Sequence, residues 1–166
     1  MQLRSRCLLV GVTLMVFGTL SAWAGPNPLA GNPSLGKWKL NVEKSKFEPG
    51  PAFKSEMRVY DDWGGGLIHA VFEGVDPQDK PTYREFVARL DGKDYPWARR
   101  GASTAWTIAL KPVNKQTFDF TAKEDGKVSY TGTHSVSADG KVMTIIFKGT
   151  NAQGQPVGAT MVYDRQ

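Results

Sequence analysis

Cysteine is nearly absent from this sequence. The single cysteine among 166 residues is Cys7, which lies inside an apolar N-terminal run. Disulfides, thiolate metal sites and cysteine nucleophiles are therefore excluded for the rest of the chain. Histidine is almost as scarce, with only His69 and His134. A transition-metal site would need carboxylates beside them, and we expect neither a metal nor a cofactor.

The usual motifs of catalysis and of nucleic-acid binding are also missing. The sequence contains no nucleophile elbow, no phosphate-binding loop and no histidine-rich metal helix. Basic residues do not cluster but alternate with acidic ones, as in the Lys-Glu-Asp-Gly-Lys stretch at residues 123–127. A nucleic-acid interface would gather its charge on one face. We therefore expect no nucleic-acid partner, and we favour a binding protein over an enzyme.

The first 24 residues have the pattern of a secretory signal. Arg4 and Arg6 precede an apolar run from Cys7 to Leu20, and Ala22-Trp23-Ala24 supplies the small-x-small cleavage pattern. The alternative is a membrane anchor, but the run is shorter than the roughly 20 residues that a span needs. We predict cleavage after Ala24, a periplasmic or secreted protein, and no stable membrane insertion afterwards.

The remaining chain fits one domain. Residues 25–35 are rich in proline, glycine and asparagine, which predicts a flexible lead-in. Residues 36–166 are long enough to bury a core, and we expect them to form a single monomeric domain. Without Arg4 and Arg6, 19 basic residues remain against 16 acidic ones, so the net charge is only +3.

Short alternating segments separated by turn signals predict an all-β fold. Asp91-Gly92, Asp125-Gly126 and Asp139-Gly140 are pairs that tight hairpins favour. Between the turns, apolar and polar residues alternate, as expected for antiparallel strands with one buried face. We predict a single antiparallel up-and-down barrel of eight to ten strands, because closure removes the exposed sheet edges. A two-sheet sandwich is the alternative.

Two short motifs resemble the calycin group, which comprises lipocalins and fatty-acid-binding proteins. Residues 36–40 (Gly-Lys-Trp-Lys-Leu) resemble the opening strand of these families, and residues 160–165 (Thr-Met-Val-Tyr-Asp-Arg) resemble the closing strand of fatty-acid-binding proteins. Residues 36–47 also resemble the start of small exported bacterial proteins described as lipocalin-like. The resemblance implies a lipocalin-like barrel in which Trp38 plugs one end and the interior holds a ligand.

The chain departs from fatty-acid-binding proteins in two ways. Those proteins insert two helices after the first strand, whereas the prolines between Val42 and Lys54 oppose helix formation here. Their carboxylate-gripping Arg-x-Tyr pair falls on Met161 and Tyr163, and a methionine cannot neutralise a carboxylate. This difference favours a neutral or weakly polar ligand.

Alternation selects the residues that a barrel would turn inward. His134 shares a face with Val128, Tyr130 and Val136, and Arg84 shares a face with Phe86. Each has a plain alternative: His134 as a core residue with a satisfied ring, and Arg84 in a surface salt bridge if the register slips by one. The predicted ligand-binding residues are Arg84, Phe86, Trp106, Phe118, Tyr130, His134 and Tyr163.

Three functional hypotheses follow. The leading one is a barrel that binds a small apolar or amphipathic molecule in its interior. The second is a barrel filled by side chains that acts through loop residues Trp63, Trp97, Arg99 and Arg100 as an envelope interaction or inhibitor module. The third is a small barrel enzyme that uses His134 as a base.

Overall fold

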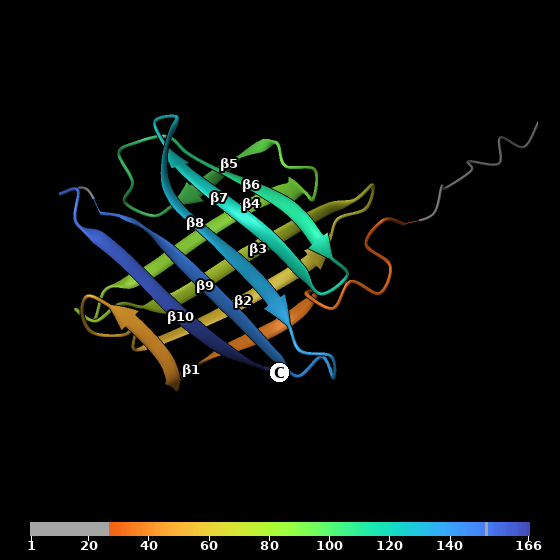
Figure 1. Ribbon diagram of the computed structural model, residues 1–166, viewed down its shortest axis with the longest axis horizontal. Coiled ribbons are helices and arrows are strands. Elements are labelled where there is room, and N and C mark those ends of the chain that lie inside the picture. The colour runs from red at the N-terminus through yellow and green to blue at the C-terminus, as the bar shows by residue number, and fades with distance from the viewer. Residues whose placement is uncertain (1–26, 152) are drawn as a thin grey trace, which may run out of the picture.

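The computed structural model describes residues 27–151 and 153–166 and has ten strands and no helix in this part of the chain (Figure 1). The predicted signal sequence lies outside the described residues. The strands are β1 (Gly36–Glu48), β2 (Ser55–Asp62), β3 (Leu67–Val75), β4 (Pro81–Arg89), β5 (Asp94–Arg99), β6 (Trp106–Asn114), β7 (Thr117–Glu124), β8 (Lys127–Val136), β9 (Val142–Thr150) and β10 (Pro156–Arg165).

Each strand pairs with its neighbours in sequence, and β1 pairs with β10 to close the sheet. All of these pairings are antiparallel. The predicted up-and-down barrel is therefore confirmed, with ten strands, and the sandwich alternative is wrong. Closure leaves no sheet edge open for pairing with another chain.

The turns follow the predicted chemistry. Asp125 and Gly126, between β7 and β8, both have positive φ angles, of 48° and 77°. Two successive residues of this kind make the tight hairpin turn that suits the twist of the strands. Gly92 and Gly140 also have positive φ angles, at the other two aspartate-glycine turns.

Alternation predicts most of the interior correctly. Ile108, Leu110, Phe118, Met143 and Ile145 are all buried. Val128 was expected on the inner face of β8 but is 57% exposed. The pairing of β7 with β8 shifts by one residue, so that Ala122 lies opposite Tyr130 and Lys123 opposite Val128. This bulge reverses the inward–outward alternation in the part of β8 that precedes Tyr130, and so turns Val128 outward.

Trp38 lies at one end of the barrel and is completely buried. Its indole Nε1 donates a hydrogen bond of 2.9 Å to the carbonyl oxygen of Ser34. The guanidinium of Arg165 lies 4.1 Å from the centre of a Trp38 ring and also donates to the carbonyl of Leu35. Residues 27–35, described here, therefore pack against this end, with Leu29 only 2% exposed, although their composition predicts a flexible segment.

Candidate functional site

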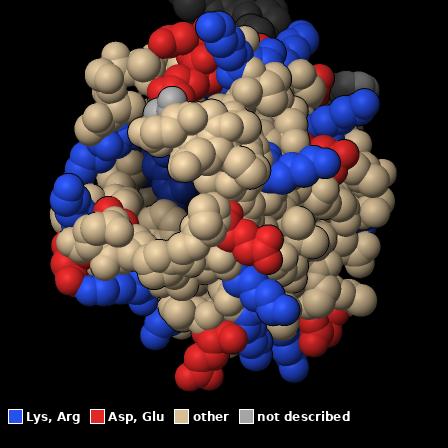
Figure 2. Space-filling model, turned by 60° about the vertical axis from the view of Figure 1, so that its left-hand side comes forward, with Lys and Arg blue, Asp and Glu red and all other residues tan. Residues whose placement is uncertain are grey.

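A cavity of about 300 Å³ lies inside the barrel, away from Trp38. Its mouth is formed by the connection between β1 and β2, including Pro49 and Pro51, and by Asn151 and Gly158 near the turn between β9 and β10. Figure 2 shows the surface hollowed on this side of the molecule, with basic side chains visible inside the hollow. The volume equals that of about ten water molecules in the liquid, at roughly 30 Å³ each.

The cavity walls are mostly aromatic and aliphatic. Rings on neighbouring strands pack edge to face, including Phe72 against Phe86 at 5.8 Å and Tyr130 against Phe147 at 5.8 Å. Such edge-to-face pairs are an arrangement that the ring quadrupole favours. The apolar lining residues are Phe47, Phe53, Phe72, Phe86, Ile108, Leu110, Phe118, Phe120, Ile145, Phe147, Val157 and Met161.

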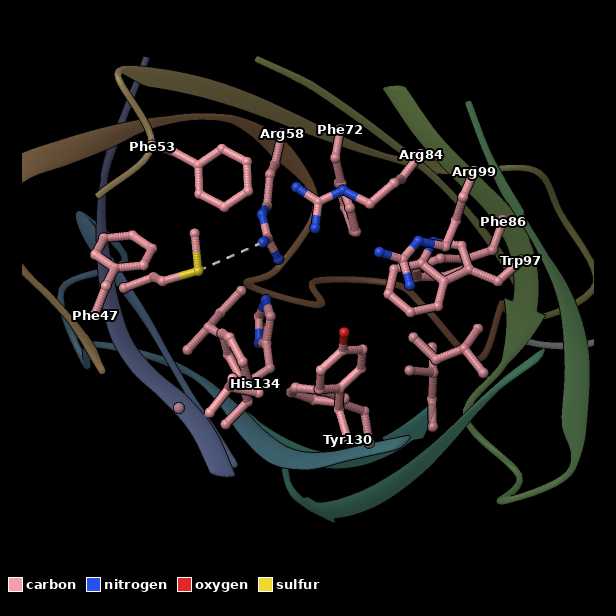
Figure 3. A pocket seen from close by; sticks show the side chains of 18 of the residues that line it. Phe47, Phe53, Arg58, Phe72, Arg84, Phe86, Trp97, Arg99, Tyr130 and His134 are labelled. Carbon is pink, nitrogen blue, oxygen red and sulfur yellow. Dashed lines mark hydrogen bonds between the residues drawn. The ribbon is translucent and has the colours of Figure 1, made fainter. Parts of the chain in front are cut away.

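Three arginines also face this cavity, namely Arg58, Arg84 and Arg99 (Figure 3). They come from the inner faces of β2, β4 and β5. In Figure 3, Arg99 lies beside Trp97, whereas the Arg84 guanidinium extends toward Phe53, whose ring centre is 5.5 Å away. The arginines are therefore interspersed with aromatic rings in the cavity wall.

Glu56 is a completely buried carboxylate that partners two of these arginines. Arg58 Nε donates to Glu56 Oε1 at 2.6 Å, and Arg84 Nη2 donates to Oε2. Tyr163 Oη also donates to Oε1, at 2.6 Å. Burial acts to raise the pKa of Glu56, but the charges of Arg58 and Arg84 and the bond from Tyr163 outweigh it, so that the pKa is lowered. The carboxyl is ionised at neutral pH.

Arg58 is fully engaged by its surroundings. Its guanidinium lies 4.2 Å from the centre of the Phe72 ring and 4.8 Å from that of Tyr163. Its Nη2 contacts the sulfur of Met161 at 3.9 Å, which is the dashed line in Figure 3. Arg58 therefore lies beside the Met161 and Tyr163 pair from another strand, but Glu56 already neutralises its charge.

His134 is 1% exposed, and neither ring nitrogen has a hydrogen-bond partner among the described residues. Its ring stacks on Phe118 at 4.1 Å and meets the edge of Tyr60 at 5.5 Å. Burial lowers the pKa of His134 to about 3, with a further contribution from the charge of Arg58. The imidazole is therefore neutral at physiological pH and has one donor and one acceptor nitrogen, both buried and unpartnered within the described residues.

The structure brings five of the seven predicted ligand-binding residues to the cavity wall: Arg84, Phe86, Phe118, Tyr130 and His134. The other two lie behind the wall. Trp106 stacks under Tyr130 at 5.7 Å and donates its indole hydrogen to Thr104. Tyr163 is completely buried and its hydroxyl is held by Glu56. Both support lining residues rather than contact the cavity.

Sequence reasoning missed Glu56 and Arg58. They alternate with Met57 and Val59 along β2, and the apolar pair would normally mark the inner face. The register with β3 places Arg58 opposite Phe72 and Tyr60 opposite Ala70, both of which are buried. The period-two spacing of Glu56, Arg58 and Tyr60 could have shown that they share one face of β2. Their polarity, however, suggested that this face points to solvent.

Trp97 and Arg99 also lie elsewhere than expected. The interaction-module hypothesis placed them on exposed loops with Trp63 and Arg100. Instead, both point from β5 into the cavity, and the Arg99 guanidinium lies 3.9 Å from the centre of a Trp106 ring. Trp63 and Arg100 are exposed. Two of the four residues of the expected contact patch are therefore not available at the surface loops.

Comparison with known proteins supports the fold alone. No protein-family model matches the chain, and no curated protein matches it. Among solved structures, the crystal structure of Rv2717c from M. tuberculosis is similar, with a TM-score of 0.56 and 14% sequence identity, over 82% of this chain and 95% of that chain. At this identity the similarity establishes a common barrel architecture and carries no information on ligand or activity.

The described residues hold no group of three or more histidine, cysteine, aspartate or glutamate side chains placed to bind a metal ion. Within the same residues, no helix is long and apolar enough to cross a membrane.

Proposed function

We propose that this protein binds a small amphipathic molecule inside its barrel. The observation that carries the proposal is the aromatic-walled cavity of about 300 Å³. This volume lies at the lower end of the range for ligand pockets, which is roughly 300–1,000 Å³. A barrel filled by its own side chains would not leave such a space, which favours ligand binding over the filled-barrel hypothesis.

The mixture of lining groups supports an amphipathic ligand rather than a wholly apolar one. Burial of an apolar portion against the aromatic walls would supply affinity at roughly 25 cal/mol per Å². Lining residues also carry buried polar atoms without partners among the described residues, including both nitrogens of His134 and Nε1 of Trp97. Buried polar groups normally have hydrogen-bond partners, so a ligand with polar atoms would complete the site.

The setting of this function is also a proposal. The Gly-x-Trp opening strand and the ten-stranded barrel support membership of the lipocalin-like proteins. The pattern of residues 1–24 supports export and a periplasmic or secreted monomer. A carrier or scavenger of small amphiphiles in the cell envelope is consistent with both.

Native mass spectrometry of the protein purified gently from its own cells tests the proposal. We expect a stoichiometric extra mass that is released on denaturation. A protein that is bare, and that stays bare after incubation with an envelope lipid extract, would contradict ligand binding and would favour a protein partner.

Titration with the neutral fluorophore N-phenyl-1-naphthylamine provides a second test. We expect enhanced fluorescence with the wild-type protein and weaker binding by Tyr130→Ala, which removes a ring from the cavity wall. Ile146→Ala is the matched control, because Ile146 lies on the adjacent β9 but is 54% exposed. Equal binding by both variants would place the dye outside the barrel.

A further inference from the structure

Arg84 and Arg99 lie directly opposite each other on neighbouring strands. They are a register pair of β4 and β5, and both side chains face the cavity (Figure 3). Like charges in directly opposed positions destabilise an antiparallel pair. Such a pair inside a barrel therefore needs a negative charge nearby.

The protein supplies only part of that charge. Glu56 accepts a hydrogen bond from Arg84, but it is shared with Arg58. Arg99 forms no ion pair with any described residue. Three guanidiniums thus line the cavity, and the one buried carboxylate, Glu56 behind the wall, pairs with two of them. Among the described lining residues the acidic one is Glu48, which is exposed at the mouth.

Donor groups on this side of the cavity are also unused. Arg84 Nε, Arg99 Nη1 and Trp97 Nε1 are buried atoms without a hydrogen-bond partner among the described residues. Trp97 and Arg99 share the inner face of β5, and the Arg99 guanidinium lies 5.0 Å from the centre of a Trp97 ring. Burial lowers the pKa of Arg99, and the charge of Arg84 lowers it further, although interactions with Tyr130 and Glu124 oppose this shift.

We propose that an oxyanion, the carboxylate or phosphate head of the amphiphile, binds between Arg84 and Arg99. This inference rests on the proposed function and names the head group of its ligand. Guanidinium forks match the geometry of such oxyanions, and charged hydrogen bonds are the stronger kind. The head accepts hydrogen bonds from the guanidiniums of the two arginines, and the tail lies along the aromatic lining of the cavity. The absence of an arginine at Met161 is thus compensated on β4 and β5.

Matched probes of one chain length test the inference: decanoate, decyl phosphate and decan-1-ol, titrated by calorimetry into the whole protein. We expect at least one anion to bind about tenfold or more tightly than the alcohol, which corresponds to about 1.4 kcal/mol. The stronger of the two anions identifies the head group. Equal affinity for all three probes would overturn the anion site and leave the proposed function standing. Failure of all three to bind, with no binding of the neutral fluorophore, would overturn both.

Variants of Arg99 separate the site from general charge effects. Arg99→Met should abolish the preference for the anion while retaining binding of decan-1-ol. Arg100→Met is the matched control, because it removes the same charge from the next residue, which is exposed. If both variants reduce anion binding equally, long-range charge and not a site explains the preference.

Stability of the ligand-free protein provides an independent measurement. Because Arg99 opposes Arg84 without a carboxylate of its own, Arg99→Met should keep or raise the melting temperature while anion binding is lost. A purely structural role for Arg99 predicts the opposite, a large decrease. Arg99→Gln, which keeps a polar side chain, gives a second variant for the same comparison.

Discussion

Buried polar side chains inside this barrel differ sharply in whether their charges and hydrogen-bonding groups have partners. Glu56 and Arg58 have their charges matched and their hydrogen bonds made, whereas His134 has neither nitrogen bonded within the described part of the chain. Glu56 and Arg58 therefore form a structural part of the wall. His134 is a polar side chain held in an apolar setting, which lowers the stability of the fold and is common where a ligand binds.

Glu56→Gln should destabilise the fold strongly. The substitution leaves Arg58 and Arg84 buried with their carboxylate removed, and breaking a buried pair in this way costs about 3–5 kcal/mol. Urea unfolding should show this loss in the free energy of unfolding. Glu43→Gln, at an exposed position of β1, is the control and should change it by no more than about 0.5 kcal/mol. A comparable small change for Glu56→Gln would mean that the network contributes little.

His134 should make the protein less stable in acid. The folded state holds its pKa at about 3, whereas the value for an unperturbed histidine is 6.5. Between these pH values the unfolded chain binds one more proton than the folded one. The free energy of unfolding therefore falls as pH decreases from about 6.5, by at most about 1.4 kcal/mol per pH unit.

His134→Phe isolates this contribution, because phenylalanine keeps a stacked ring and cannot titrate. Chemical unfolding at pH 7 and pH 5 should show a smaller loss of stability in the variant than in the wild type. Glu56 and the surface carboxylates affect both proteins alike. An identical pH dependence in the two proteins would show that His134 is protonated, or solvated, in the folded state.

At the scale of elements, the ends of the barrel are built differently. One end is sealed by Trp38 and by the described part of the lead-in, with Arg165 holding the carbonyl of Leu35. The other end carries the cavity mouth between the connection from β1 to β2 and the turn from β9 to β10. No helix covers this mouth among the described residues, as the prolines before Lys54 predicted.

Gly36 is the first residue of β1, at the sealed end of the barrel. Its backbone conformation explains why the Gly-x-Trp motif has a glycine at this position. Its φ of 121° lies in a region that other residues rarely adopt, and a Cβ there would come within 2.7 Å of Arg165 Nη1. Gly36→Ala should cost about 1–3 kcal/mol through backbone strain and displacement of Arg165. Thermal unfolding measures the loss. Gly140 also has a positive φ but open space around its Cβ position, so Gly140→Ala should show the strain without the displacement and cost less.

The molecule as a whole combines a closed sheet with an interior that is not filled. The ten strands satisfy one another's backbone groups, so the barrel does not depend on complete packing of its centre. This is why the cavity and its two opposed arginines can be tolerated. A ligand that fills the cavity and pairs with the arginines should restore the free energy of unfolding that this site lowers.

Bound ligand should therefore stabilise the protein by mass action. At a free decanoate concentration of 100 times Kd, the free energy of unfolding should rise by about 2.7 kcal/mol. Differential scanning fluorimetry should register this as a rise in melting temperature that depends on ligand concentration. Arg99→Met should lose most of the shift and Arg100→Met should retain it. A melting temperature that decanoate leaves unchanged in the wild type, at concentrations that calorimetry shows to saturate, would indicate equal binding to the unfolded chain.

The sequence alone predicted an antiparallel all-β fold, because strand alternation and turn chemistry are local properties, whereas it left a sandwich as the alternative to a barrel. The aspartate-glycine turns and the inward positions of Ile108 and Phe118 can be read from short segments, and the burial of Trp38 was implied by the resemblance of residues 36–40 to calycins. The candidate site could be predicted only in part. Arg84 and His134 follow from alternation along their own strands, whereas Val128 does not, because a bulge reverses the pattern of β8.

Only the tertiary structure decided which charges meet. Glu56 and Arg58 lie inside because closure of the barrel places that face of β2 toward the cavity, although their apolar neighbours Met57 and Val59 indicated the reverse. The opposition of Arg84 and Arg99 depends on the register of β4 with β5. Register is a non-local property, since a slip of one residue would turn every side chain to the other face. The arrangement of charged side chains at the site therefore results from strand pairing and not from any sequence motif.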